Sequence, residues 1–133
     1  MNKIVAIVTK IERIESLHIV SFQFNNYKLE MMSLELGEDV KVGQKVVLGV
    51  KPTHISFAKN LDGKISISNQ IRAKIKGINK GKLLSSAIFE TNYTLIESVF
   101  TTTSLKEMNL QLHDEFTILI KASDLSILEV KND

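Results

Sequence analysis

The sequence predicts an all-β protein made of two tandem copies of one small module, and two internal matches carry this prediction. Residues 46–55 return as residues 116–125: each segment is an apolar run followed by Lys, a small or rigid residue, a hydroxyl residue, a polar residue and an aliphatic residue. The two lysines, Lys51 and Lys121, are 70 positions apart (121 − 51). Residues 2–11 likewise match residues 69–78 at an offset of 67 (71 − 4). Because both matches occur in the same order, they favour duplication over a chance likeness of β-rich segments.

The offset rises from 67 to 70 along the chain, so the second copy contains about three additional residues, and a surface connection absorbs such an insertion at little cost. Ser104 followed by Glu107 resembles a capping box, and Leu105, Met108 and Leu112 have the spacing of an apolar helical stripe. We therefore expect a short helix over residues 101–110, and this helix accounts for the additional residues.

The remaining segments predict strands, because apolar residues alternate with polar ones and β-branched residues are frequent. Asn25 and Asn92 mark tight turns, since Asn tolerates left-handed backbone conformations. Pro52 donates no backbone hydrogen bond, so a strand ends or lies at an edge there. The expected strands cover residues 3–13, 17–24, 27–33, 44–50 and 55–58 in the first copy and residues 65–78, 83–90, 93–100, 115–121 and 125–130 in the second. Residues 131–133 are expected to fray.

The connection between the copies is short. Residues 60–63, Asn-Leu-Asp-Gly, contain the best turn signal in this region. We therefore place the first module at 1–60 and the second at 64–133. With so short a connection, the modules should pack closely or share strands rather than move freely.

Composition excludes several classes of protein. The chain has 133 residues and no Cys, so disulfides and thiolate metal sites are excluded. No apolar stretch approaches the roughly 20 residues that a membrane span needs, and no signal peptide is apparent. A net charge of +2 does not by itself indicate nucleic-acid binding. We expect a cytoplasmic protein that does not bind to membranes.

No catalytic or metal-binding pattern is present. The three His residues lie far apart in the sequence, without a carboxylate partner at ligand spacing. The pairs Glu12 with Glu15 and Glu35 with Glu38 have no nucleophile beside them, so they read as surface charge. We expect neither a metal site nor an enzyme.

Four segments of the second copy follow a known pattern. Residues 66–70, Ser-Ile-Ser-Asn-Gln, resemble a Ser-Ala-Arg-Asn-Gln motif at the start of the module, and residues 120–123 form an Ile-Lys-Ala-Ser motif near its end. Residues 76–81 resemble the first hairpin of that pattern, and residues 101–110 resemble its helix, which has the sequence Thr-x-x-Ser-x-x-x-Leu-x-Leu. This pattern is similar to the TOBE/Mop modules of molbindins, of molybdate-responsive regulators and of transport-ATPase C-terminal domains. Residues 48–55 of the first copy are nearer to the transport-ATPase variant, and the resemblance covers nearly the whole chain.

The resemblance implies two OB-like (TOBE/Mop) β-barrel modules, with the short helix in the second. It also implies a homo-oligomer, dimer or trimer, that binds oxyanions between modules, with molybdate or tungstate as the ligand and no covalent cofactor. The chain departs from the family at Ser68, which stands where the motif has Arg. Ser offers one hydroxyl, whereas the guanidinium of Arg offers several N–H donors and a permanent positive charge. The first copy lacks this motif altogether.

A tetrahedral dianion needs several converging hydrogen-bond donors and some positive charge. Hydroxyls, backbone N–H groups and a Lys ammonium supply both, and each residue that we select offers one of them. The candidates are Lys121, Ala122, Ser123, Ser66 and Ser68 in the second copy, with Lys51 and Thr53 in the first. We expect the second set to be the better one, because Pro52 removes a backbone donor that Ala122 keeps. The alternative is a solvated Lys at a strand end beside ordinary turn residues.

The sequence thus predicts intracellular binding of an oxyanion, for storage, homeostasis or sensing. One alternative is a ligand-free regulatory or assembly module associated with a transport ATPase. Another is an OB-like nucleic-acid binder, because five basic residues line one hairpin: Arg72, Lys74, Lys76, Lys80 and Lys82. Against this last alternative, the chain has no Trp, and its Phe residues alternate as core residues do.

Overall fold

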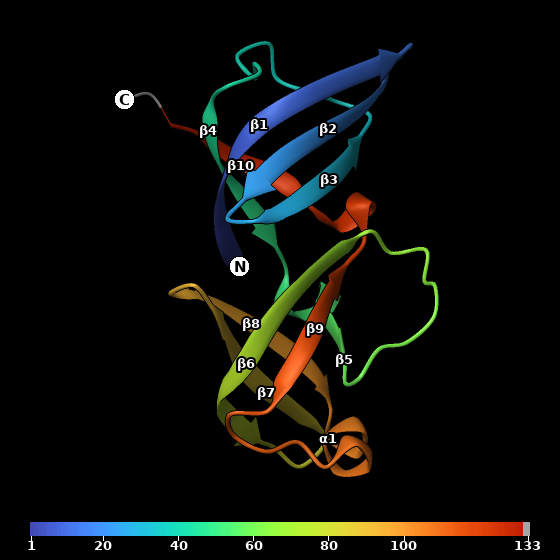
Figure 1. Ribbon diagram of the computed structural model, residues 1–133, viewed down its shortest axis with the longest axis vertical. Coiled ribbons are helices and arrows are strands. Elements are labelled where there is room, and N and C mark those ends of the chain that lie inside the picture. The colour runs from blue at the N-terminus through green and yellow to red at the C-terminus, as the bar shows by residue number, and fades with distance from the viewer. Residues whose placement is uncertain (132–133) are drawn as a thin grey trace.

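The computed structural model describes residues 1–131, and strands dominate it (Figure 1). Its elements are β1 (Asn2–Ile14), β2 (Leu17–Phe24), β3 (Tyr27–Ser33), β4 (Lys45–Val50), η1 (Pro52–His54), β5 (Ser56–Ala58), β6 (Asn69–Lys80), β7 (Leu84–Thr91), β8 (Thr94–Thr101), α1 (Thr102–Met108), β9 (Glu115–Ile120), η2 (Ala122–Asp124) and β10 (Ser126–Val130), where η denotes a 3₁₀ helix. The predicted all-β fold with one short helix in the second copy is confirmed. The expected fraying at residues 132–133 lies outside the described residues.

The strands form two curled five-stranded antiparallel sheets, one in each half of the molecule (Figure 1). The first sheet has the order β10-β4-β1-β2-β3, and the second has the order β5-β9-β6-β7-β8. Along β1 and β6 the buried side chains alternate with exposed ones, which is the pattern of strands with one face on a core. Each sheet is an OB-like half-barrel.

Each sheet takes its fifth strand from the other half of the sequence. β5 leaves the first copy and pairs with β9, while the C-terminal β10 pairs with β4. The expectation that the modules share strands is therefore confirmed. The limits 1–60 and 64–133 describe the sequence repeat, and as limits of folding units they stay a prediction.

The duplication extends to backbone details. A β-bulge follows Val8 in β1 and Ile75 in β6. The N–H of Gly43 donates to the carbonyl of Val8 over 2.7 Å, and the N–H of His113 donates to the carbonyl of Ile75 over 2.9 Å. Gly43 and His113 both have positive φ, 93° and 72°. His113 thus adopts a conformation that costs Gly nothing but is uncommon for other residues.

Helix α1 forms where the second copy has its additional residues, but its capping differs from the prediction. Thr101, not Ser104, is the N-cap: its hydroxyl accepts the N–H of Ser104 over 3.3 Å. Leu105 and Met108 pack against the core as expected. Leu112 lies beyond the helix and is 52% exposed, so the predicted stripe is two residues long. No helix in the described part of the chain is long and apolar enough to cross a membrane.

The exchanged strand β5 supplies a central residue to the core of the second sheet. The ring centroid of Phe57 lies 5.1 Å from that of Phe89, 5.0 Å from that of Phe100 and 5.5 Å from that of Phe116. Such tilted and edge-on pairs add about 0.5–1.5 kcal/mol each beyond their buried area. The prediction that the Phe residues are core residues is confirmed: Phe22, Phe24, Phe89 and Phe116 are buried, and Phe57 and Phe100 are half-buried and pack against the core.

Candidate functional site

The two matching segments of the sequence fold into matching corners, where β4 and β9 end. Lys51 and Lys121 are extended, with φ and ψ of −70° and 142° for the first and −66° and 143° for the second. A single 3₁₀ turn follows each lysine. The N–H of His54 donates to the carbonyl of Lys51 over 2.9 Å, and the N–H of Asp124 donates to that of Lys121 over 2.9 Å.

The two corners meet at the junction between the sheets. Nδ1 of His54 lies 3.6 Å from Oδ1 of Asp124, and these residues occupy matching positions in the two copies. A shallow hollow of about 120 Å³ lies between the corners. Its lining consists of Met1, Gly49, Val50, Lys51, His54, Ser123, Asp124 and Ser126. The structure therefore brings together Lys51 and Ser123, two of the predicted site residues.

The other predicted residues do not line this hollow, and most of them form a second group. The β6–β9 ladder ends at the pair Asn69 and Ile120, so residues 66–68 and residues 121–123 continue from the same end of this strand pair. Ser66, Ser68 and Lys121 are exposed, and Ala122 is half-buried. Thr53 is exposed in the first corner and belongs to neither group.

Charge distinguishes the two groups. In the hollow, Lys51 lies with the carboxylate of Asp124, which would repel an anion. The second group contains the ammonium of Lys121 and no carboxylate on residues 66–68 or 121–123, and the carboxylate of Asp124 reaches it only beside Ser123. Lys121 forms no ion pair with any of residues 1–131. The ammonium of Lys121 is thus exposed and has no acidic partner in the described part of the chain.

The sequence analysis missed the residues that position both corners, Asn2 and Asn69. The side chain of Asn69 accepts from the N–H of Glu30 over 2.7 Å and donates to its carbonyl over 2.9 Å. Asn2 makes the same two bonds to the backbone of Glu97, each over 2.8 Å. The signal was present in the sequence, because Asn occupies matching positions at the start of both copies.

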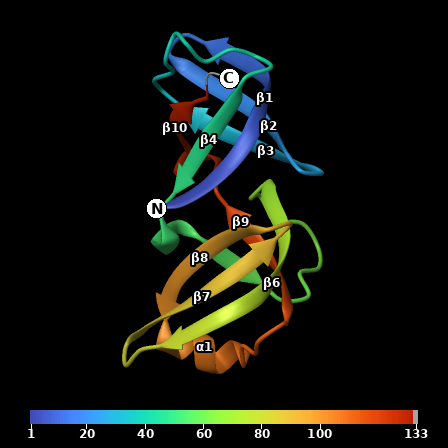
Figure 2. The same ribbon diagram turned by 90° about the vertical axis from the view of Figure 1, so that its left-hand side faces the viewer.

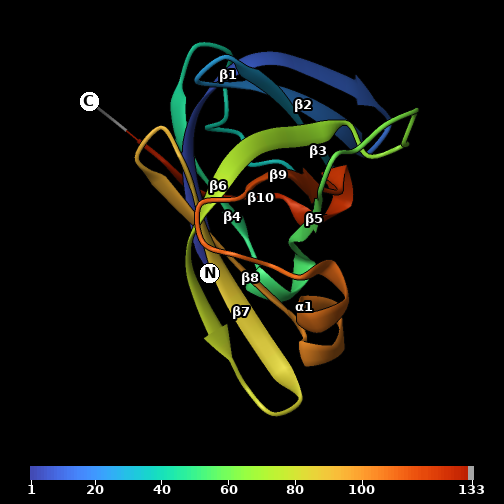
Figure 3. The same cartoon turned by 60° about the horizontal axis from the view of Figure 1, so that its bottom comes forward.

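Each of these amides ties the first residue of a long strand to the third strand of the other sheet, β6 to β3 and β1 to β8. Figure 3 shows β6 running beside β3. Asn69 is fully buried and Asn2 is 7% exposed. At the same junction Ser98 donates its hydroxyl to the carbonyl of Ile55 over 2.7 Å. The geometry of the corners is therefore set by buried polar contacts, which hold it more firmly than exposed contacts would.

Comparison with known proteins supports the fold. No family model matches the chain, and no curated protein matches its sequence. Among solved structures, the fold is similar to that of the cytoplasmic molybdate-binding protein ModG in a crystal form with molybdate bound. The TM-score is 0.88, the sequence identity is 20%, and the match covers 95% of this chain and 94% of that chain. The two-sheet architecture is thus shared along nearly the whole of both proteins.

Proposed function

We propose that this protein binds a tetrahedral oxyanion, molybdate or tungstate, in the cytoplasm and without catalysis. The binding sites lie where modules meet in a homo-oligomer. One observation carries the proposal: the two corners with Lys and a hydroxyl residue, which the sequence repeats, converge at the junction between the sheets. The fold is that of ModG, which is itself described as a cytoplasmic molybdate-binding protein.

The ligand is assigned to the group with Lys121, which shares Ser123 with the hollow that Asp124 lines. In this group the oxyanion would accept hydrogen bonds from the ammonium of Lys121, the hydroxyls of Ser123, Ser66 and Ser68, and the N–H of Ala122. A hydrogen bond to a charged group contributes about 1.5–3 kcal/mol. One ammonium does not neutralise a dianion, so a second chain supplies the remaining charge and the protein is a dimer or a trimer. Such a protein would store, buffer or sense its oxyanion.

The nucleic-acid alternative gains no support. On the basic hairpin, Arg72 pairs with Glu115 over 2.9 Å, and Lys76 pairs with Glu90 over 3.3 Å. These contacts reduce the positive field that a phosphate backbone requires. The Phe rings pack against one another in the core instead of offering stacking surfaces.

The test is a thermal-shift panel of molybdate, tungstate, sulfate and phosphate, followed by calorimetry with the best ligand. At 100 times Kd, a ligand stabilises the folded state by about 2.7 kcal/mol. Lys121→Ala and Ser123→Ala should each weaken binding by about 10- to 150-fold, the equivalent of one charged hydrogen bond.

The matched controls are Lys106→Ala and Thr103→Ala, which remove an exposed Lys and an exposed hydroxyl from α1. Both should bind as the wild type does. If none of the four anions raises the melting temperature, the ligand-free assembly module becomes the better reading. Equal losses in the α1 variants and in the corner variants would refute the assignment of the site.

A further inference from the structure

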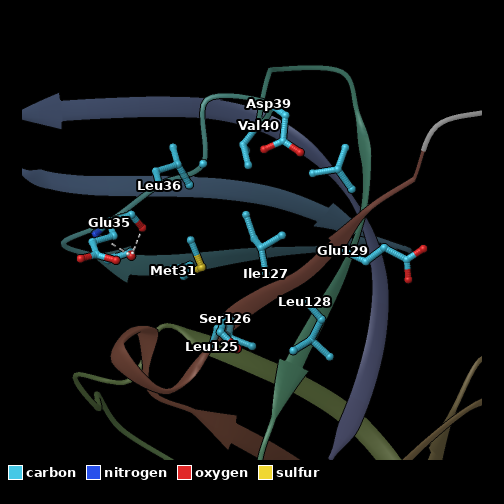
Figure 4. Close-up of a pocket in the computed structure, with 13 residues that line it drawn as sticks. Met31, Glu35, Leu36, Asp39, Val40, Leu125, Ser126, Ile127, Leu128 and Glu129 are labelled. Carbon is cyan, nitrogen blue, oxygen red and sulfur yellow. Dashed lines mark hydrogen bonds between the residues drawn. The ribbon is translucent and has the colours of Figure 1, made fainter.

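A larger hollow, of about 300 Å³, opens in the first half of the molecule (Figure 4). It lies between β3 and β10, which are the two outer strands of the first sheet, and the chain after β3 closes one side. The residues that line it are Met31, Ser33, Glu35, Leu36, Gly37, Asp39, Val40 and Leu125 to Val130. This hollow is separate from the corners that the proposed function uses.

The second copy shows why the hollow exists. In the second sheet, Phe57 and Phe100 pack 5.0 Å apart and fill the matching space between β5 and β8. At the matching positions the first copy has Ile127 and Ser33. It also has no helix after its third strand, where the second copy has α1. The first copy therefore keeps open a space that aromatic side chains occupy in the second.

The hollow has an apolar floor and an acidic rim. Figure 4 shows Met31 and Ile127 in the middle, with Glu35, Asp39 and Glu129 around them. The lining contains no Lys, Arg or His. Within the described part of the chain, none of the three carboxylates forms an ion pair. A partner that fits this surface presents exposed apolar side chains flanked by positive charge.

The chain itself carries such a surface at the β6–β7 turn, residues 79–84, here called the tip. Leu83 is 79% exposed and Leu84 is 61% exposed. Lys80 and Lys82 precede them in the turn, and residues 79–84 include no acidic residue. Exposed leucines beside unpaired lysines are the chemical complement of the hollow.

Buried hydrogen bonds hold the tip in one conformation. The N–H of Thr102 donates to the carbonyl of Leu83 over 2.8 Å, and its hydroxyl donates to the carbonyl of Gly81 over 3.0 Å. The hydroxyls of Thr102 and Ser85 lie 2.8 Å apart, and these residues are 4% and 3% exposed. A Cβ on Gly81 would lie 2.1 Å from the carbonyl oxygen of Leu84, so the turn requires glycine. A tip fixed in this way loses little conformational entropy when it binds.

We propose that the tip of one copy docks into the hollow of a second copy of this chain. The hollow belongs to the first sheet, whereas the tip lies at the far end of the second sheet (Figure 2). A chain therefore cannot fill its own hollow. The contact joins two different surfaces, so it is repeated from copy to copy and builds either a closed ring or an open chain of subunits.

The β1–β2 turn is one competing tip, and its charge makes it the poorer match. Ile14 is 77% exposed there, but residues 10–15 carry two basic and two acidic side chains, Lys10, Arg13, Glu12 and Glu15, and Lys10 pairs with Glu12 over 3.7 Å. The formal charges of this turn cancel, whereas residues 79–84 carry two positive charges and no negative one, so the tip is the better electrostatic complement of the acidic rim. The β1–β2 turn therefore provides a matched control.

Sedimentation velocity tests the proposal with two blocked chains. The tip-blocked chain carries Leu83→Ser and Leu84→Ser, and the hollow-blocked chain carries Asp39→Lys and Glu129→Lys. We expect the wild type to sediment above the monomer mass and each blocked chain to sediment at a lower mass than the wild type. An equimolar mixture of the two blocked chains should sediment at a higher mass than either blocked chain alone, because one intact tip and one intact hollow remain between them. Ile14→Ser should leave the mass of the wild type unchanged.

The substituted leucines and carboxylates are exposed, so the variants should fold, and their melting temperatures check this. A monomeric wild type at high micromolar concentration overturns the proposal. So does a blocked chain that keeps the mass of the wild type, or a mixture that sediments no faster than the blocked chains do alone. No anion is added in these runs, so a failure of oxyanion binding leaves their outcome unaffected.

Discussion

Replacing Asn69 by alanine removes the amide that fastens β6 to β3. The side chain is fully buried and makes two hydrogen bonds to the backbone of Glu30, over 2.7 Å and 2.9 Å. Two neutral hydrogen bonds contribute about 1–3 kcal/mol together, and each group of Glu30 left without a partner adds to the loss. We expect Asn69→Ala to lower the free energy of unfolding by about 2–4 kcal/mol. In urea the midpoint should fall by roughly 1–2 M, because the slope is about 1–3 kcal/mol per molar.

Asn69→Asp separates the hydrogen bonds from the shape of the side chain. The new carboxylate keeps the acceptor for the N–H of Glu30, but it places an oxygen where the amide donated to the carbonyl. Burial beside that carbonyl raises the pKa of the introduced acid, so the loss should be largest at neutral pH and should shrink as the pH falls and the acid is protonated. Asn2→Ala, at a 7% exposed site near the chain start, should cost less. An unchanged urea midpoint for Asn69→Ala, or a loss for Asn69→Asp that does not vary with pH, would refute this reasoning.

Three further predictions concern the framework. Thr101→Ala should cost about 1 kcal/mol in urea unfolding, because it removes the N-cap of α1, whereas an effect below a few tenths would mean that the cap contributes nothing. Gly81→Ala should cost more than about 1 kcal/mol, since its Cβ would lie 2.1 Å from the carbonyl oxygen of Leu84, and an unchanged midpoint would contradict the tight turn. Fragments 1–60 and 64–133 should each fail to give the native circular-dichroism spectrum alone, because each fragment lacks the strand that the other half supplies. When the two fragments are mixed, the native spectrum should return. A native spectrum from one fragment alone would show that the exchanged strand is dispensable.

Much of the candidate site was visible in local sequence. An apolar run that ends in Lys predicts a strand that reaches the surface, and Pro52 or Ala122 next to it predicts a turn, so Lys51 and Lys121 were found at matching corners. The partners across the junction could not be found in this way. Asn69 bonds to Glu30, which is 39 residues away, and no short-range pattern encodes that distance. The contact of His54 with Asp124 likewise depends on two turns being brought together by the sheets.

In helix α1 the sequence pattern was recognised, but its position along the chain was predicted wrongly. Ser104 and Glu107 have the spacing of a capping box, but the helix begins earlier, where Thr101 ends β8. Leu112 has helical spacing but lies past Asn109, whose left-handed backbone ends the helix. Both errors arise because a pattern gives the period of an element more reliably than its ends.

The sequence by itself determined the all-β class, the duplication, the turns and the single short helix. Alternating apolar and polar residues, Asn and Pro each influence the backbone only within a few residues, so their effects can be predicted from local sequence. Only the tertiary structure decided that β5 and β10 cross to the opposite sheets, that buried amides join the copies, and that one copy is left with an open hollow. Those outcomes depend on which strand edge and which buried space are free once both sheets have formed. The residues that form these edges and spaces are far apart in the chain, so they cannot be identified from the sequence of any single segment.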